Sequence, residues 1–366
     1  MSRATGALID LAALRHNLKR VRALAPKSRV MAVLKANAYG HGLALAAQAL
    51  ADADAFAVAS LEEAQVIRRA GLSNPIVLLE GVFGEQELEE AARWGCELVV
   101  HDGYQLKLIE KCGLRGELAV WLKVDTGMNR LGFAPDAVAD AWKRLNKAKA
   151  VKPPVRLMTH FASADETSNP KTQSQLEAFA AATAGIQAER SIANSAGILA
   201  WPASHADWVR PGSMLYGASP FPMKCGADDG LKPVMTMETT LIAVKVLKKG
   251  ESVGYGGAFV APEDMTLGIA AIGYGDGYPR HAPSGTPVLV KGVRVPLVGR
   301  VAMDMIGVDL RGVRSPAVGD RVAAWGPELP VEEIARAAGT IPLELLCGVT
   351  QRVKFSVIDT KEKTRR

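Results

Sequence analysis

Apolar and amphipathic segments alternate along the first two-thirds of the chain. Short runs of β-branched and other apolar residues are followed by Ala-, Leu- and Glu-rich stretches with a helical period. The runs are nearly continuous in their apolar character, which is typical of parallel strands covered on both faces. The eight runs comprise residues 30–36, 55–60, 75–81, 97–102, 118–127, 155–163, 190–195 and 208–217.

The stretches between these runs predict helices. Two of them, SLEEAQVIRRAG and GEQELEEAARWG, end at a glycine, as a helix with a C-terminal cap does. Eight strand–helix units in roughly 200 residues favour an α/β fold of the (β/α)8, TIM-like barrel type. A doubly wound open sheet is the alternative.

The pattern changes near residue 230, where helical stretches give way to alternating apolar and polar positions. The runs TTLIAVKVL, TLGIAAIGYG, TPVLVKGVRVPLVGRV and GDRVAAWG are separated by Gly, Pro and Asp turns, and a late helix is predicted at VEEIARAAG. We therefore expect a barrel over residues 1–228 and a C-terminal, mainly antiparallel β domain over residues 229–366.

Composition and charge narrow the classes of function. The 366 residues are 48% hydrophobic and 22% charged, as in a globular protein. The net charge of +6 lies in short clusters without interleaved aromatics, so we expect no nucleic-acid partner. No apolar run approaches the ~20 residues that span a bilayer, and no signal-peptide pattern is present, which predicts a cytoplasmic protein without a membrane partner. The four cysteines and six histidines lack ligand spacing, so no metal site is predicted.

A lysine in the stretch VMAVLKANAYGHG is the first candidate for chemistry. Lys35 lies in a run that reads as a buried strand, and we expect it to end that strand. An ion pair near the barrel rim would explain it. Alternatively, a desolvated amine with a lowered pKa could form a Schiff base or act as a base, because catalytic groups of barrels lie at the C-terminal ends of strands.

Polar groups at the later strand ends favour the chemical role. The side chains are those of Lys123, Asp125, Arg130, His160, Asp165, Asn194, Ser195, Arg210 and Ser213, and Gly212 offers its backbone. The last two turns supply small residues, hydroxyls and backbone N–H groups, where barrels often hold a phosphate. A Schiff-base lysine opposite a phosphate seat suggests pyridoxal phosphate. The glycines of GYGG (254–257) and GYGDG (273–277) do not fit a dinucleotide-binding loop and predict turns.

The chain resembles the alanine racemases, pyridoxal-phosphate enzymes with a barrel and a β domain. The resemblance covers nearly the full length and implies pyridoxal 5′-phosphate as cofactor and interconversion of L-alanine and D-alanine as activity. Its motifs are VLKANAYGHG (33–42), LKVDTGMNRLG (122–132), HFASADE (160–166), VRPGSMLYG (209–217), VGYGG (253–257), GYGDGYPR (273–280) and GRVAMDM (299–305).

The resemblance implies roles for single positions. Lys35 matches the lysine that binds the cofactor covalently, and Tyr255 matches a second catalytic base. Arg210 matches the arginine facing the pyridine nitrogen, with His160 supporting it. The other cofactor-binding positions are Tyr39, Ser195, Gly212 and Ser213.

Substrate groups are implied in the same way. Arg130 and the backbone of Met303 match the groups that meet the substrate carboxylate, and Lys123 matches a lysine often carbamylated in this family. The positions implied around the entrance or behind the site are Asp165, Tyr274, Arg280, Arg300, Asp304 and Leu343.

Racemisation removes the Cα proton from one face and returns a proton to the other, which needs an electron sink and two bases. Lys35 would serve one face and Tyr255 the other, although a tyrosine with a reference pKa of ~10 must be perturbed or paired with a cation to act at neutral pH. In the family this tyrosine comes from the partner subunit, so the resemblance implies a homodimer with shared active sites. The sequence does not distinguish two biological roles, supply of D-alanine for the cell wall and breakdown of D-alanine.

Plainer roles also stay open for some residues. His41 could cap a turn, Lys123 could pair with Asp125, and Tyr274 and Arg280 could be ordinary surface residues. Two rival functions are a decarboxylase of basic amino acids with the same fold and a non-catalytic pyridoxal-phosphate carrier. The decarboxylase would need a cysteine–aspartate element that the β domain lacks, and carriers resemble the barrel alone.

One position departs from the family pattern. The family usually carries tyrosine in a stretch like TIPYELLC, whereas this chain has TIPLELLC with Leu343. Leucine is shorter and donates no hydrogen bond. We therefore expect a looser hold on the cofactor phosphate and relaxed specificity toward amino acids larger than alanine. The downstream QRVKFSV also differs from the usual ending.

Overall fold

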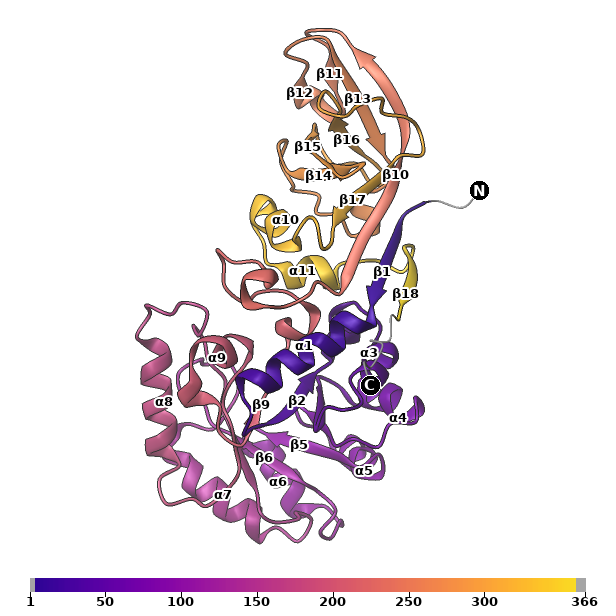
Figure 1. Ribbon diagram of the computed structural model, residues 1–366. Coiled ribbons are helices and arrows are strands. Elements are labelled where there is room, and N and C mark those ends of the chain that lie inside the picture. The colour runs from indigo at the N-terminus through magenta and orange to yellow at the C-terminus, as the bar shows by residue number, and fades with distance from the viewer. Residues whose placement is uncertain (1–3, 360–366) are drawn as a thin grey trace, which may run out of the picture. The chain divides into compact units, whose positions relative to one another are not determined.

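The computed structural model describes residues 4–359 and divides the chain into two compact units (Figure 1). The barrel unit is Asn17–Leu215, and the β unit combines residues 4–16 with residues 216–359. This division differs from the expected 1–228 and 229–366 at both ends. The N-terminal difference arises because the strand over Gly6–Asp10 pairs with strands over Met235–Leu247 and Lys354–Ile358, which no local pattern reveals.

Eight parallel strands of the barrel unit close into a barrel in chain order. Each coincides with one of the apolar runs, so the expected (β/α)8 barrel is confirmed. The strands are β2 (Arg29–Val33), β3 (Ala55–Val58), β4 (Ile76–Leu78), β5 (Cys96–Val100), β6 (Val120–Lys123), β7 (Arg156–Met158), β8 (Arg190–Ser191) and β9 (Trp208–Val209).

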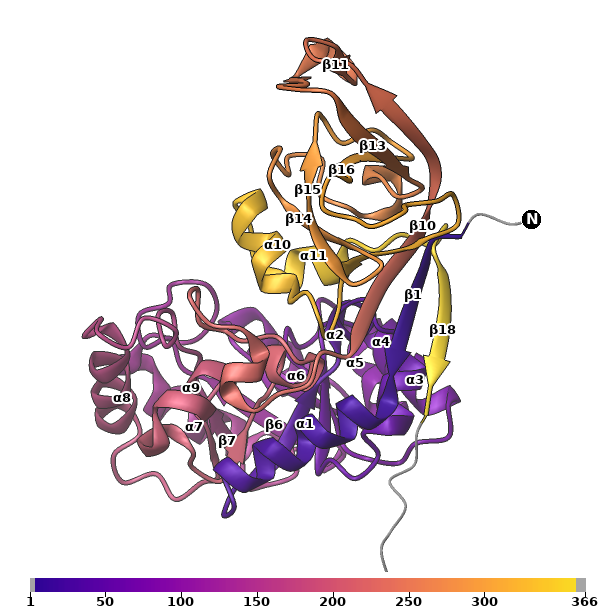
Figure 2. The same ribbon diagram turned by 45° about the horizontal axis from the view of Figure 1, so that its top comes forward.

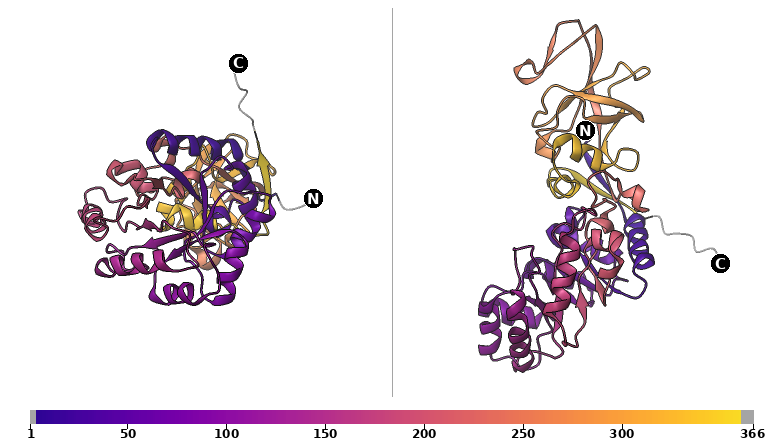
Figure 3. Two further views of the ribbon diagram at one scale, coloured as in Figure 1. Left: turned by 90° about the horizontal axis from the view of Figure 1, so that it is seen from below. Right: turned by 90° about the vertical axis from the view of Figure 1, so that its left-hand side faces the viewer.

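Helices surround these strands, as the view from below in Figure 3 shows. The two glycine-terminated stretches are helical, and each ends before a glycine in the left-handed region, Gly71 at φ +84° and Gly95 at φ +62°. The helices of this part are α1 (Leu11–Leu24), α2 (Lys35–Tyr39), α3 (Leu43–Ala49), α4 (Leu61–Arg69), α5 (Glu85–Arg93), α6 (Gly103–Lys111), α7 (Val138–Lys147), α8 (Lys171–Ala182) and α9 (Ser195–Ala200).

Alternate residues of the strands fill the barrel interior. Pairs two positions apart, such as Met31 and Val33 or Ala55 and Ala57, belong to one buried cluster. Two tryptophans contribute the largest side chains, and the rings of Trp121 and Trp208 meet edge to face with centroids 5.9 Å apart. The barrel is therefore a packed core, and chemistry is left to its ends.

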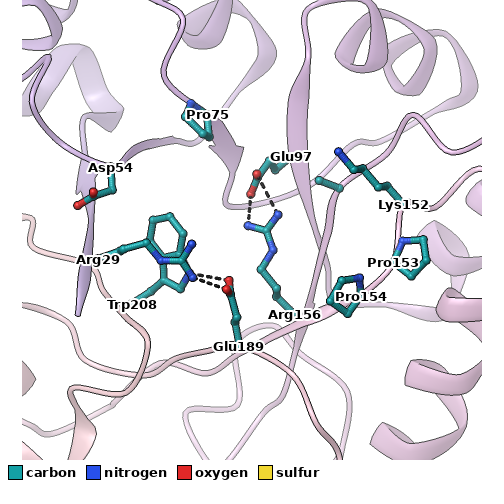
Figure 4. Close-up of a pocket in the computed structure, with 11 residues that line it drawn as sticks. Arg29, Asp54, Pro75, Glu97, Lys152, Pro153, Pro154, Arg156, Glu189 and Trp208 are labelled. Atoms are coloured by element: carbon teal, nitrogen blue, oxygen red, sulfur yellow. Dashed lines mark hydrogen bonds and ion pairs between the residues drawn. The ribbon is translucent and has the colours of Figure 1, made fainter. Parts of the chain in front are cut away.

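Charged pairs line a cavity of 480 Å³ at the N-terminal ends of the strands (Figure 4). Arg156 donates to Glu97 through two nitrogens, at 2.8 and 3.1 Å, and Arg29 pairs with Glu189. Each arginine stacks on a tryptophan whose Nε1–H donates to the same glutamate. This cavity lies at the opposite end of the barrel from Lys35 and Lys123. Residues at that end of a barrel usually contribute to stability rather than to catalysis.

The β unit contains a mixed eight-stranded sheet, visible in Figure 2. Its order is β13-β16-β15-β14-β17-β10-β1-β18, with β13 also paired to β10. The pairs are antiparallel except β1 with β18, which is parallel. Its strands are β1 (Gly6–Asp10), β10 (Met235–Leu247), β13 (Met265–Ala270), β14 (Pro287–Val290), β15 (Val293–Val298), β16 (Ile306–Asp309), β17 (Arg321–Trp325) and β18 (Lys354–Ile358).

The four alternating runs and the late helix of the β unit form as expected. They become β10, β13, the hairpin of β14 and β15, and β17, followed by α10 (Val331–Ala338). A two-stranded ribbon of β11 (Ser252–Val253) and β12 (Phe259–Val260) and the helix α11 (Pro342–Cys347) complete the unit. In residues 4–359 we find no helix long and apolar enough to cross a membrane.

Candidate active site

Lys35 opens an unusual turn at the C-terminal rim of the barrel. The strand β2 ends at Val33, so the expectation that Lys35 ends the strand is wrong by two residues. The four residues 36–39 all have φ between 51° and 54°, a left-handed helical turn without glycine. Such a conformation costs roughly 1–2 kcal/mol per residue and tends to occur at functional sites.

Polar contacts within the chain hold this turn. The Asn37 Oδ1 accepts a hydrogen bond from the Leu43 N–H at 2.8 Å. The His41 Nδ1 lies 3.0 Å from the Ala38 carbonyl and 2.9 Å from the Tyr39 carbonyl. Burial lowers the pKa of His41 to about 4, so its imidazole is neutral and Nδ1–H can donate to both carbonyls. His41 therefore caps the turn, which is the plainer of its expected roles.

Lys123 is the last residue of β6 and is 9% exposed. Burial, followed by the charges of Arg210, Arg130 and Lys35, lowers the pKa of its amine to about 8. Among the described residues no ion pair joins it to Asp125, whose Oδ1 instead accepts the Gly127 and Asn129 N–H groups. The alternative of a Lys123–Asp125 pair is thus not supported, and Asp125 shapes the loop that carries Arg130.

Arg210 is buried just beyond β9 and is fixed by oxygen acceptors. It donates to Ser191 Oγ, to the Thr159 carbonyl and, at 3.3 Å, to the Ile192 carbonyl. Burial lowers its pKa to about 10, which still leaves the guanidinium charged at neutral pH. The Nδ1 of His160 lies 3.5 Å from its Nη2. Burial and the neighbouring cations hold the pKa of His160 well below its usual value, so a neutral imidazole lies beside Arg210.

The turns after β8 and β9 form a seat made of backbone and hydroxyl groups. Ser195 Oγ accepts from the N–H of Gly212 at 2.9 Å and from that of Met214 at 3.4 Å. A Cβ atom added to Gly212 would lie 2.7 Å from Tyr39 Oη, so only glycine leaves this space open. The structure thus brings Tyr39, Ser195, Gly212 and the adjoining Ser213 together.

Positive charge dominates this rim. The electrostatic neighbours of His160 are Arg210, Lys123, Arg130 and Lys35, while Glu80 is the acid that acts on Lys123. Four cations in a partly desolvated site favour ligands with anionic groups, such as a phosphate and a carboxylate. Asp165 lies in the loop after β7 and is half-buried.

The predicted residues of the β unit form a second group. The Tyr274 N–H donates to the Ala302 carbonyl at 3.1 Å, which places Tyr274 beside Met303. Arg300 lies against Gly254 and Gly256, the neighbours of Tyr255. Tyr255, Met303 and Tyr274 are 68%, 52% and 39% exposed, which is unusual for such large apolar side chains. Arg280 is exposed and Leu343, in α11, is half-buried.

Comparison with known proteins agrees with this geometry. A family model described as "Alanine racemase, N-terminal domain" matches residues 9–220, and one described as "Alanine racemase, C-terminal domain" matches residues 234–357. A curated alanine racemase of Nitrosococcus oceani is 58% identical over 350 residues, 95% of this chain and 97% of that protein. The chain belongs to the alanine racemase family.

Other members of the alanine racemase family are similar over the same length. The alanine racemase of Halorhodospira halophila is 50% identical over 360 residues, 98% of this chain and 99% of that protein. The crystal structure of a biosynthetic alanine racemase from Pseudomonas aeruginosa has a TM-score of 0.95 at 46% identity, and the match covers 98% of this chain and 100% of that one. The family and fold expected from sequence are therefore confirmed.

One buried residue that organises the racemase barrel rim was missed in the sequence. Gln175, on α8, is fully buried and uses its whole amide. Its Nε2 donates to Thr126 Oγ1 and to the His160 carbonyl, both at 3.1 Å, and its Oε1 accepts from the Ala162 N–H at 2.9 Å. Gln175 thereby joins the loop carrying Arg130 to the loop carrying His160. No periodicity or motif distinguishes it within the stretch KTQSQLEAF.

Proposed function

We propose that the protein interconverts L-alanine and D-alanine with pyridoxal 5′-phosphate, working as a homodimer. The cation cluster at the barrel rim, with the neutral His160 held against Arg210, carries the proposal. It provides positive charge for two anionic groups in a site that also holds a lysine. The family's name and the 58% identity to a curated alanine racemase support the choice of substrate.

The rim fits the proposed cofactor in shape and charge. The open space at Gly212, bordered by Tyr39 Oη and the Ser195 hydroxyl, suits the close approach of a phosphate to backbone N–H groups. Lys35, on the strained turn, would hold the cofactor covalently. Arg210 stays charged at neutral pH and transfers its proton to no other group, so it would leave the pyridine nitrogen unprotonated.

When bound, pyridoxal phosphate supplies the electron sink that makes the Cα proton of an amino acid acidic. The chain's own residues would do the rest. Arg130 and the backbone of Met303 orient the substrate carboxylate. The Nζ of Lys35, released when the substrate amine takes its place on the cofactor, would take or return the proton on one face, and the Oη of Tyr255 would do so on the other.

The exposure of Tyr255 supports a shared active site. A catalytic tyrosine that is 68% exposed in the single chain needs another surface to exclude water from its phenol. The partner's barrel rim would provide that surface. Mixing two inactive variants tests this: Lys35→Ala and Tyr255→Phe chains, unfolded and refolded together, should regain activity because hybrid dimers contain one intact site. Absence of any recovery in verified hybrids would refute site sharing.

The activity itself is tested with L-alanine, protein and pyridoxal phosphate in heavy water. Optical rotation and the Cα proton signal should both disappear, because each turnover exchanges the proton with solvent through a base. Exchange without loss of rotation would mean that one base assignment is wrong. No change in either signal would exclude alanine racemisation and favour a carrier or a decarboxylase. A cytoplasmic location stays a prediction.

A further inference from the structure

Contacts between two turns of the β unit hold the backbone of Met303 in place. The first turn is residues 273–277, and the second is residues 302–305. The N–H of Gly275 donates to the Met303 carbonyl at 2.9 Å, and the Ala302 N–H donates to the Met305 carbonyl at 3.0 Å. A Cβ on Gly273 would lie 2.3 Å from the Ala302 oxygen and 2.5 Å from the Met303 carbonyl carbon. Gly273 has φ −152°, an extended conformation that other residues also adopt. Glycine is therefore required here by the close contact with the second turn and not by the backbone conformation.

Arg352 joins the same two turns through their carboxylates. Its Nε lies 3.1 Å from Asp276 Oδ1, and its Nη2 lies 2.6 Å from Asp304 Oδ1. The second oxygen of Asp276 accepts the Gly273 N–H at 2.8 Å. A Cβ on Gly275 would lie only 2.6 Å from Arg352 Nη1, so the guanidinium packs directly on the glycine beneath Met303.

The segment that carries Arg352 is itself fixed to the first turn. Thr350 Oγ1 donates to the Gly275 carbonyl at 2.8 Å, and the Thr350 N–H donates to the Asp276 carbonyl at 3.2 Å. The Asp276 side chain is fully buried, whereas those of Met303 and Asp304 are about half exposed, at 52% and 49%. Apolar packing therefore contributes little to the position of the Met303 turn, and polar contacts must supply it.

We propose that Arg352 is a positioning residue for recognition of the substrate carboxylate, which it serves by bridging Asp276 and Asp304 and so holding the Met303 backbone. This inference rests on the proposed function, in which the Met303 backbone meets that carboxylate. A lysine would not replace Arg352 fully, because a single ammonium lacks the planar fork that reaches two carboxylates at once.

Loss of this bridge should weaken binding more than chemistry. Arg352→Met should raise the KM for L-alanine about tenfold, equivalent to about 1.4 kcal/mol. The inhibition constant of acetate, a carboxylate without an amine, should rise by a similar factor, while kcat changes less than about threefold. Arg352→Lys should recover part of the loss.

Arg294→Met is the matched control, because Arg294 forms a comparable two-nitrogen pair with Glu333, at 2.6 and 2.9 Å, in the same unit. It should leave KM and the acetate constant unchanged. If Arg352→Met and Arg294→Met raised KM and the acetate inhibition constant equally, a general loss of stability would explain the effect and the proposal would be overturned.

Asp304→Asn tests the same bridge if Arg352→Met fails to fold, because it leaves the Arg352–Asp276 pair intact. It should raise both constants in the same direction, and combining it with Arg352→Met should add little. Suppose that the wild-type protein racemises alanine and that neither Arg352→Met nor Asp304→Asn changes KM or the acetate constant. That result would refute the role of Arg352 and leave the proposed function intact. An inactive wild-type protein would instead refute the proposed function.

Discussion

The environment of Lys123 predicts that this lysine is chemically reactive near neutral pH. With a pKa of about 8, about a quarter of the amine is neutral at pH 7.5, against about 0.1% for an ordinary lysine. Only the neutral amine adds to carbon dioxide. We therefore expect a carbamate at Lys123, whose negative charge would be stabilised by Arg130 and Arg210.

Two measurements check the reactivity of this amine. With ¹³C-bicarbonate, the wild-type protein should give a carbamate carbonyl resonance that is absent from Lys123→Met. In carbon dioxide-free buffer, acetylation of Lys123 followed by mass spectrometry should increase with pH around a midpoint near 8. A labelling midpoint near 10, the value of an exposed lysine, would refute the reasoning.

The same lowered pKa predicts how stability depends on pH without carbon dioxide. The pKa of the lysine is about 8 in the folded state and ~10.4 in the unfolded state, so the unfolded state binds more protons between these values. Wild-type stability should therefore rise as pH increases from about 8 to about 10. Below pH 8 the lysine is charged in both states and the full cost of burying its charge applies, so Lys123→Met should be more stable by about 3 kcal/mol.

Urea unfolding at pH 7 and pH 10 measures this difference. The advantage of Lys123→Met should fall below about 1 kcal/mol at the higher pH, because the folded lysine is then neutral and the unfolded one is partly so. An advantage of equal size at both pH values would come from packing of the methionine and would contradict the electrostatic explanation. Added bicarbonate should reduce the advantage at neutral pH by converting the wild-type amine to its carbamate.

Three further changes test other parts of the molecule. Glu97→Gln should lower the free energy of unfolding in urea by about 2–3 kcal/mol, because the Glu97–Arg156 ion pair is mostly buried. Glu189→Gln, in the more exposed pair with Arg29, should lower it by under about 1 kcal/mol. Equal losses of stability would contradict this difference. Gly212→Ala should abolish the cofactor absorbance band without unfolding the protein, because its methyl group would lie 2.7 Å from Tyr39 Oη. Leu343→Tyr should lower kcat/KM for serine relative to alanine, and an unchanged ratio would disprove a gating role of this position.

Much of the site was predictable because catalytic positions of a barrel follow its strands. Once the eight apolar runs were recognised, the polar residues directly after them were bound to meet at one rim. His160 and Arg210 are adjacent for this reason. Gln175 was not predictable, since a buried glutamine in a helix is distinguished only by the two loops that it connects. Arg352 likewise gains its place from two turns distant in sequence.

Other outcomes depended on contacts that local patterns do not contain. The run around Lys35 predicted a strand, and a strand forms, but the following left-handed turn contains four residues that usually avoid this conformation. A hydrogen bond accepted by the Asn37 side chain and one donated by His41 stabilise it once the chain has folded around them. The glycines of GYGDG predicted a turn correctly, whereas the need for glycine at Gly273 comes from its contact with Met303.

The amino-acid sequence was enough to give the order and type of the main elements, to favour a barrel over an open sheet, and to indicate the residues near its C-terminal rim. It could do so because hydrophobic periodicity records which face of each element is buried. The tertiary structure alone decided the pairing of β1 with β10 and β18, the lowered pKa of Lys123 and the bridge of Arg352. Each of these depends on desolvation or contact between distant segments, and both arise only when those segments have come together.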